Sequence, residues 1–270
     1  YALWPNSPAM MHGHSLLWFA LALVGLWLVL RTIVTSRWLA AFSFLLFAID
    51  DAHAGAIGWI AARNSLIALT FALFALWAHD RYVRHGWRWG SVVGPLLFVL
   101  ALAGAEAAVA LVAYLFAHAL LLDRGSGARR LLHIAPYGII VLLFAGLYSA
   151  LGAGAHATGQ YVSPTGEPVR FAGALFARMP GLLHAQLAGP PADLIPFYST
   201  LHPGLTHVMW LAAVLVVALF GWLLWPLFRT DRVTRFWAVG AVLATVPACA
   251  GFPSDRQLLF VSVGVSAVLA

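Results

Sequence analysis

Long apolar stretches, separated by short polar segments, fill this chain of 270 residues and constrain its fold more than any other feature. A water-soluble domain of this size could not cover them, because 63% of the residues are hydrophobic, 9% are charged and the mean hydropathy is +0.90. The bilayer must therefore be the solvent for most of the chain. The sequence predicts an all-α, polytopic integral membrane protein.

The apolar stretches predict about nine transmembrane spans, within a single domain that covers residues 1–270. Several stretches are shorter than the roughly 20 residues that a straight helix needs to cross the hydrocarbon core. We therefore expect them to extend into flanking Ala, Trp and Gly residues or to form broken helices. The stretches are 15–30, 38–49, 65–77, 92–102, 107–122, 131–151, 207–227, 236–250 and 258–270.

The one long polar segment, residues 152–206, is rich in Gly, Pro, Ser and Thr and is expected to be an external loop between spans. Its first part, YVSPTGEPVRF, predicts a turn-bearing hairpin or loop. The next part, FAGALFARMPGLLHAQLAGPP, has apolar residues at helical spacing around Arg178. This spacing fits either an amphipathic helix in the membrane interface or an ordinary loop helix.

The basic residues are distributed unevenly and include no Lys. Of the 15, eleven lie in four short segments that occupy alternate gaps between apolar stretches. Because cytoplasmic loops carry an excess of basic residues, these segments predict cytoplasmic turns, and the other gaps predict the outer face. Each cluster adjoins an apolar stretch, so we expect no nucleic-acid partner despite a pI near 10.1. The clusters are Arg31 with Arg37, Arg81 with Arg84 and Arg88, Arg124 with Arg129 and Arg130, and Arg229 with Arg232 and Arg235.

This orientation puts Tyr1 on the outer side, before an inward-going helix, which suggests a piece of a longer protein. The chain also ends within an apolar stretch. Arg as the only basic residue, together with abundant Ala and Gly, suggests a GC-rich bacterial genome. We therefore expect an inner-membrane protein whose active face is periplasmic. The single Cys249 cannot form an internal disulfide.

The segment FAIDDAHAGAIGWIAARNSL, residues 47–66, contains the main candidate catalytic residues, Asp50, Asp51 and His53, and the candidate substrate-binding residue Arg63. Charged groups at the ends of apolar helices are a functional-site hypothesis by default. Asp50 and Asp51 would repel each other unless a cation, sugar hydroxyls or Arg63 compensated, or one of them were protonated. The alternative is a solvated turn in which one Asp caps the next helix.

Two further residues stand out outside this segment. Glu106 has apolar residues on both sides, so it faces a polar cavity, is held neutral, or bonds to a neighbouring helix as a structural group. Arg256, in FPSDRQLLF, suits a pair of phosphate oxygens, or else anchors the interface together with Asp255. No metal ligands are assigned and no cofactor is certain, although a divalent metal beside the Asp pair stays an option.

These residues resemble those of the GT-C-type polytopic glycosyltransferases, the superfamily of the protein O-mannosyltransferases. Trp59, Ile60, Arg63 and Leu66 match a W-I-x-x-R-x-x-L stretch of that family, and Glu106 matches the acidic member of an S-K-E-T-like stretch. SDRQLLFVSVGVSAVLA is similar to the family's R-Y-L-Y-L-P-S-x-G segment. Ala105 replaces the family's Lys, and the Asp pair replaces its His-Pro turn. The resemblance covers most of residues 1–125 and residues 254–270.

The resemblance implies transfer of a sugar from a polyprenyl-phosphate donor to a glycan, lipid or protein acceptor on the outer face. Such a reaction needs a carboxylate to take the acceptor proton and cationic groups to stabilise the departing phosphate. In that reading Asp50, Asp51 or His53 orients the acceptor or a metal. Arg63 or Arg256 holds the phosphate, while the family's main catalytic carboxylate lies in an outer loop that this chain does not contain. Glu106 lines the cavity.

Two other classes of function remain open. A cation- or proton-coupled transporter could use Asp50, Asp51 and Glu106 as a path between broken helices. A non-catalytic membrane scaffold with the same fold would explain Ala105 in place of the family's Lys.

Overall fold

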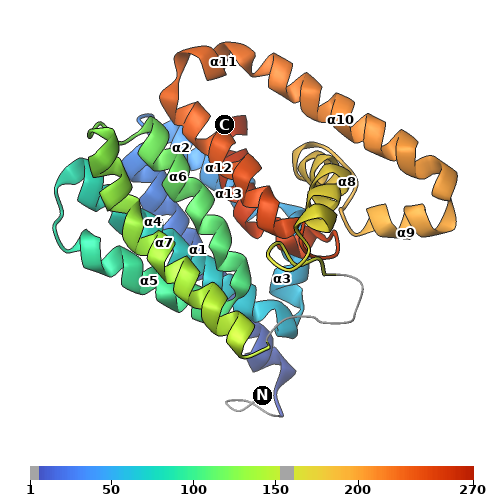
Figure 1. Cartoon of the computed structure of the whole chain (residues 1–270), viewed down its shortest axis with the longest axis horizontal. Helices are drawn as coiled ribbons and strands as arrows, with labels where there is room; N and C mark the ends of the chain where they lie inside the picture. The colour runs from blue at the N-terminus through green and yellow to red at the C-terminus, as the bar shows by residue number, and fades with distance from the viewer. Residues whose placement is uncertain (1–5, 153–160) are drawn as a thin grey trace.

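A computed structural model gives the structure of the protein and describes residues 6–152 and 161–270. The described residues form α-helices, short 3-10 helices and connections, with no strand among them, so the predicted all-α fold is confirmed. Figure 1 shows an elongated main bundle, with α10 set apart from it along one side.

The elements follow one another through short connections in most of the chain. In order they are α1 (Pro8–Ile33), α2 (Arg37–Ala48), η1 (Asp51–His53), α3 (Ala54–Gly58), η2 (Ile60–Ala62), α4 (Arg63–His85), α5 (Gly90–Gly104), η3 (Glu106–Ala110), α6 (Leu111–Leu121), α7 (Gly127–Ala150), α8 (Pro168–Leu187), α9 (Leu194–Leu201), η4 (Pro203–Leu205), α10 (Thr206–Leu223), α11 (Trp225–Thr230), α12 (Arg232–Ala248), η5 (Asp255–Gln257) and α13 (Leu259–Leu269).

Each of the nine apolar stretches lies largely in a helix, but fewer helices are long enough to cross a membrane alone. Four meet that requirement among the described residues: Pro8–Ile33, Ile60–His85, Gly127–Ala150 and Pro203–Leu223. A fifth span results if α2 and Asp51–Gly58, which meet at a bend of 46°, count as one. Helix α5 has 15 residues and measures about 22 Å, well short of a hydrocarbon core of about 30 Å. The long apolar helices indicate a membrane protein.

Polar residues in the Arg-bearing connections begin the next helices. The hydroxyl oxygens of Ser36 and Ser126 accept hydrogen bonds from backbone N–H groups at the starts of α2 and α7. Asp231 does the same for α12, through the N–H groups of Val233 and Thr234. Such caps satisfy donors that have no partner within the helix. These connections therefore define helix boundaries as well as carrying charge.

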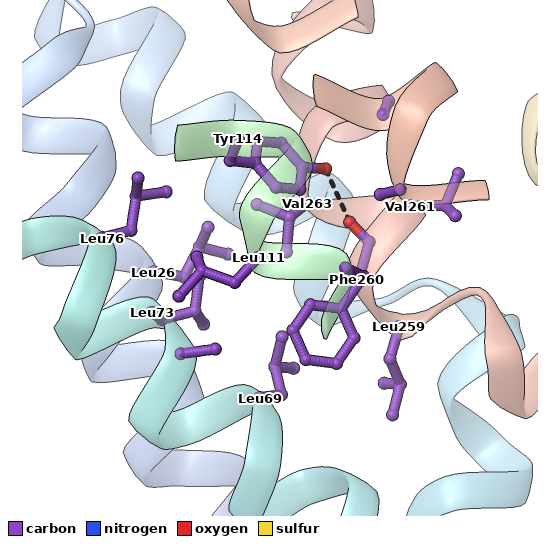
Figure 2. Packing of buried hydrophobic residues seen from close by; sticks show 14 of the residues in the cluster. Leu26, Leu69, Leu73, Leu76, Leu111, Tyr114, Leu259, Phe260, Val261 and Val263 are labelled. Carbon is purple, nitrogen blue, oxygen red and sulfur yellow. Dashed lines mark hydrogen bonds between the residues drawn. The ribbon is translucent and has the colours of Figure 1, made fainter. Parts of the chain in front are cut away.

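The centre of the bundle is a contact between α6, α12 and α13. The Tyr114 hydroxyl donates to the carbonyl oxygen of Phe260 at 2.6 Å and accepts from the Gly264 N–H at 3.0 Å. Figure 2 shows the Tyr114–Phe260 bond beside leucines of α1 and α4, including Leu26 and Leu69. The two bonds fix α13 against α6 at a point where both helices are buried.

Glycines allow this close approach. A Cβ at Gly240 would lie 2.4 Å from Tyr114 Cδ1, and one at Gly264 would lie 2.6 Å from the Trp237 carbonyl oxygen. In a bilayer, small residues let helix backbones approach closely, because lipid is as apolar as the side chains and the hydrophobic effect gives little drive for helix association. The core therefore depends on fit between α6, α12 and α13.

The segment 152–206 differs from the expected long loop, since most of its described part is helical. Helix α8 contains the predicted amphipathic stretch and packs on α10, α12 and α13 through buried residues that include Leu182 and Leu183. Before it, Pro164–Gly166 form a turn without a hairpin in the described residues. The apolar side of α8 explains this difference, because it can bury itself against the bundle.

Candidate functional site

Two segments about 200 residues apart meet at one end of the bundle. Elements η1 and α3, which follow the bend after α2, pack against η5, and α8 closes the same region. We call the group formed by Asp50, Asp51, His53, Gln186, Asp193, Asp255 and Arg256 the acidic junction. In Figure 1, α3 lies below the middle of the view with α8 to its right, whereas the α4–α5, α6–α7 and α11–α12 connections lie toward the left and upper left.

Asp50 has a structural role within the junction. Its Oδ1 accepts a hydrogen bond of 3.0 Å from the Ala52 N–H and so caps η1, as the capping alternative predicted. Its Oδ2 accepts a hydrogen bond of 2.7 Å from the side-chain amide of Gln186. Asp50 therefore ties the bend after α2 to α8.

His53 is buried and holds η1 against α13. Its Nε2 lies 2.8 Å from the Ser262 hydroxyl oxygen, and its ring packs on Phe47 with centroids 4.3 Å apart. Only 1% of the residue is exposed, so a substrate could not reach the ring without rearrangement. The predicted catalytic residue His53 is thus placed to position η1.

Asp51 is the exposed carboxylate of the pair. Among the described residues its side chain makes no hydrogen bond and no ion pair, and its charge acts on His53 and Asp255 at longer range. An unpaired carboxylate that faces solvent can accept a proton or a hydrogen bond from a ligand. Asp51 is therefore the junction residue with the most accessible chemistry.

Asp255 and Asp193 add two carboxylates to the junction. Asp255 Oδ1 accepts from the Ala192 N–H at 2.6 Å, and the Asp255 N–H donates to Asp193 Oδ2 at 3.0 Å. Burial raises the pKa of Asp255, and the negative charges of Asp193, Asp51 and Asp50 raise it further, against the opposing Ala192 hydrogen bond. The pKa of Asp255 is therefore raised mainly by burial, and the neighbouring carboxylates add to the effect.

Arg256 is the cation that faces this group. Its guanidinium lies over the Trp59 ring, 4.9 Å from the centroid, and both side chains are exposed. It makes no ion pair with any described carboxylate, although Asp255 precedes it directly. A guanidinium placed over an aromatic ring can still donate N–H hydrogen bonds to an oxyanion.

Arg63, the other predicted phosphate ligand, is engaged by α1. Its guanidinium donates to the Met11 carbonyl at 2.6 Å and to the Ser15 hydroxyl at 3.0 Å, and it lies 3.1 Å from His14 Nδ1. These contacts join the start of α4 to the start of α1. The structure therefore gives Arg63 a structural environment, apart from the acidic junction.

Glu106 begins η3, whose main neighbours are α5, α12 and α4 rather than η1 or η5. It is exposed and accepts a hydrogen bond from the Tyr148 hydroxyl of α7. Burial and the charge of Glu106 raise the pKa of the nearby Tyr161. Glu106 bonds to a neighbouring helix, which agrees with the structural alternative and separates it from the Asp50 group.

The two remaining Arg residues outside the clusters are also occupied. Arg178 donates to the carbonyl oxygens of Cys249 at 2.9 Å and Gly251 at 2.7 Å, and so satisfies the end of α12. Arg170 forms an exposed ion pair of 2.9 Å with Glu167. Of the four Arg residues outside the clusters, Arg256 alone keeps its guanidinium clear of such bonds.

Sequence reasoning missed Gln186 and Asp193, because their only signal is a polar side chain, within the last turn of an amphipathic helix for Gln186 and after that helix for Asp193. It also missed a buried group on α4 and α6, where Asp80 accepts from His118 at 2.9 Å and Arg84 at 3.0 Å. Asp80 and His118 are fully buried. Like Glu106, both are ionisable side chains within an apolar helix. Asp80 was overlooked because it lies just before Arg81 and Arg84, which were interpreted as a topology signal.

Within residues 6–152 and 161–270, no group of three or more His, Cys, Asp or Glu side chains has the geometry to hold a metal ion. The Asp residues of the junction are spread over η1, η5 and the connection after α8. The divalent metal considered from the sequence thus has no preformed ligand set in the described residues.

Comparisons of the chain with protein-family models, with curated proteins and with solved structures find no match.

Proposed function

We propose that this chain is a glycosyltransferase of the GT-C type, or a large part of one, that transfers a sugar from a polyprenyl-phosphate donor to an acceptor at the acidic junction. One observation carries the proposal. Asp51 in η1 and Arg256 in η5 are both exposed, and these two elements pack against each other at an end of the bundle away from the Arg-bearing connections. A phosphate-linked sugar donor and a hydroxyl acceptor need one group of each kind.

In the proposed reaction, Asp51 takes the part that the resemblance gives to an outer-loop carboxylate, and it accepts the proton of the acceptor hydroxyl as the oxygen attacks the anomeric carbon of the sugar. The bond between that carbon and the phosphate oxygen breaks, and its electron pair leaves with the phosphate. Arg256 stabilises the resulting charge. Asp50 and His53 hold η1 in place, and Trp59 positions Arg256.

The membrane arrangement belongs to the same proposal. The Arg-bearing connections face the cytoplasm of a bacterium and the acidic junction faces the periplasm, following the rule that cytoplasmic loops are the basic ones. Shorter apolar helices such as α5 and α13 enter the bilayer beside the long ones, giving about nine passages. A lipid-linked donor suits this face, because its prenyl tail dissolves in the bilayer.

The test is consumption of a radiolabelled polyprenyl-phosphate sugar by the full-length protein in proteoliposomes. Asp51→Asn and Arg256→Gln should each lower kcat/KM at least about 100-fold, since each removes a group used in the transition state. Glu167→Gln and Arg170→Gln are matched controls, because they remove an exposed carboxylate and an exposed guanidinium outside the junction.

Equal activity in Asp51→Asn and Glu167→Gln would reject the assigned base. Failure of the wild-type protein to consume any of a panel of lipid-linked sugars would reject the glycosyltransferase itself.

A cation- or proton-coupled transporter is the second candidate, and one observation favours it. Asp80 and His118 are buried within helices at the end opposite the junction, so titratable groups occur at both ends of the bundle. Transport predicts cation or proton uptake into proteoliposomes without any lipid-linked sugar, and this uptake should be lost in Asp80→Asn. The glycosyltransferase predicts no such uptake.

A further inference from the structure

A groove of about 520 Å³ opens between α10 and the α12–α13 pair. Its size lies within the range of about 300–1,000 Å³ typical of small-molecule sites. The lining is apolar, with a single charged residue, Arg235, at one end. Other lining residues are Leu183, Val217, Phe220, Gly221, Val239 and Val265.

The groove has the length of one membrane leaflet. On α12 it runs from Arg235 to Leu243, and on α10 and α11 from Val217 to Phe228. At a rise of about 1.5 Å per residue these stretches measure about 12 and about 16 Å. Half of a hydrocarbon core of about 30 Å is about 15 Å. An acyl chain that starts at the surface would therefore fit along the groove.

The Arg235 end lies at a membrane surface. Trp222 and Trp225, at the junction of α10 and α11, are exposed by 72% and 57%, and such Trp residues collect at the headgroup level. The cluster Arg229, Arg232 and Arg235 shares this level, since it spans the connection between α11 and α12. An acyl chain in the groove would thus have its headgroup beside three guanidinium groups.

Arg235 is poorly satisfied by the protein. Within the described part of the chain its guanidinium makes one hydrogen bond, a long contact of 3.4 Å to the Asp231 carbonyl. The Asp231 carboxylate is committed to the start of α12, where it accepts from the Thr234 N–H and hydroxyl at 2.6 Å each. By contrast, Arg130, beside a smaller pocket between α6 and α7, donates to the Gly125 carbonyl at 2.8 Å.

We propose that this groove is a binding site for one anionic phospholipid, with an acyl chain between α10 and α12 and its phosphate on Arg235. Basic pockets between membrane helices are known to bind anionic headgroups. The surplus of Arg over Asp at this end selects an anionic lipid over a zwitterionic one. The site does not depend on the proposed glycosyltransferase activity. Its Arg235 end lies on the α11–α12 side, whereas its other end, at Leu183 and Leu187 of α8, approaches the acidic junction.

Native mass spectrometry of the detergent-purified full chain tests the site, with phosphatidylglycerol and phosphatidylcholine of identical acyl chains as probes. The wild-type protein should retain one phosphatidylglycerol in preference to phosphatidylcholine. Arg235→Gln should reduce that preference about fivefold, the effect expected for one Arg near a charged headgroup. Gly221→Leu should abolish retention of both lipids, because a Cβ at Gly221 points into open space in the groove.

Two control variants make the same kinds of substitution outside the groove. Arg88→Gln removes an exposed guanidinium of another Arg cluster, and Gly146→Leu adds the same side chain to an exposed position of α7 with open space around it. Both should retain lipid as the wild type does.

Equal retention by Gly221→Leu and Gly146→Leu would overturn the proposal. So would a wild-type protein without retained lipid, or a dimer that Gly221→Leu dissociates, which would assign the groove to a second copy of the chain.

Discussion

Aspartate side chains have opposite environments at the two ends of the bundle. At the Arg-rich end, the buried carboxylate of Asp80 is matched by His118 and Arg84, and Asp123 lies 2.7 Å from His133 Nδ1. At the junction, Asp51 and Asp255 make no ion pair within the described residues. Carboxylates are thus neutralised where helices are fixed together and left uncompensated where the chain meets solvent.

This difference separates residues that stabilise the fold from residues that can bind a ligand. A paired buried carboxylate has its charge compensated, so its loss should show as a loss of stability. An unpaired exposed carboxylate contributes little to folding, and removing it should leave stability unchanged within about 0.5 kcal/mol. Stability measurements can therefore test the assignment independently of any activity.

The largest effect is expected at the Arg-rich end. Asp80→Ala removes the acceptor shared by His118 and Arg84 and leaves the buried His118 ring without this partner. Breaking such a pair costs about 3–5 kcal/mol. We expect a correspondingly large fall in the midpoint of thermal unfolding in detergent. Asp51→Ala is the matched change at the junction, and an equal fall in that variant would remove the contrast between the two ends.

Arg63 tests whether a cation near the other end serves the fold or the substrate. Arg63→Gln loses bonds to the Met11 carbonyl and the Ser15 hydroxyl, and we expect a loss of about 2–3 kcal/mol, because hydrogen bonds to charged groups are worth about 1.5–3 kcal/mol each. Arg256→Gln should keep the unfolding midpoint of the wild type. A stable Arg63→Gln protein with a raised KM for a lipid-linked donor would restore the role in phosphate binding predicted from the sequence.

Asp255 provides the smallest and most specific test. Its folded-state pKa is raised above the ordinary 3.8, first by burial and then by Asp193, Asp51 and Asp50. The folded protein therefore binds the proton of the Asp255 carboxyl more tightly than the unfolded protein does. Stability falls as pH rises from 3.8 through the raised pKa. Asp255→Asn should be more stable than wild type at neutral pH by less than about 1 kcal/mol, with the difference vanishing in acid.

Asp123 should show the opposite sign. Burial opposes its ionisation, but hydrogen bonds from the Gly125 N–H and from His133 outweigh burial and lower the pKa of Asp123 below 3.8. The contribution of Asp123 to the stability of the folded protein is present above pH 3.8 and is lost as pH falls through the lowered pKa. Thermal unfolding of Asp255→Asn and Asp123→Asn, each compared with the wild type between about pH 2 and 7, compares the two ends directly. Parallel pH curves would contradict the contrast.

The helices could be predicted from the sequence, because a long apolar stretch favours a helix whatever lies next to it. The number of membrane-crossing helices could not. Around Glu106 the sequence reads as two adjoining apolar runs, yet the chain turns there through η3 between two short helices. Whether a short helix extends or stops depends on its neighbours, which the sequence does not place.

The candidate site was predictable only in part, for a similar reason. Asp51 and Arg256 stood out as charged groups in apolar surroundings. Other members of the site are brought in by contacts between distant parts of the chain. Asp255 and Ala192 are separated by 63 positions in the sequence, and Gln186 and Asp50 are separated by 136. The partners of Arg63 were equally hidden from the sequence, since the groups that it contacts lie 48–52 positions earlier on α1. Such partners follow from tertiary packing alone.

The hydrogen bonds of Tyr114 have a consequence for biogenesis. Its partner Phe260 lies 146 positions later in the chain. At a synthesis rate of about 5–20 residues per second, a ribosome needs about 7–30 s to produce that interval. During this time α6 is in the membrane without the helix that completes its packing. Insertases and quality-control proteases would therefore meet a half-assembled bundle on every round of translation, and the α12–α13 pair would end that exposure.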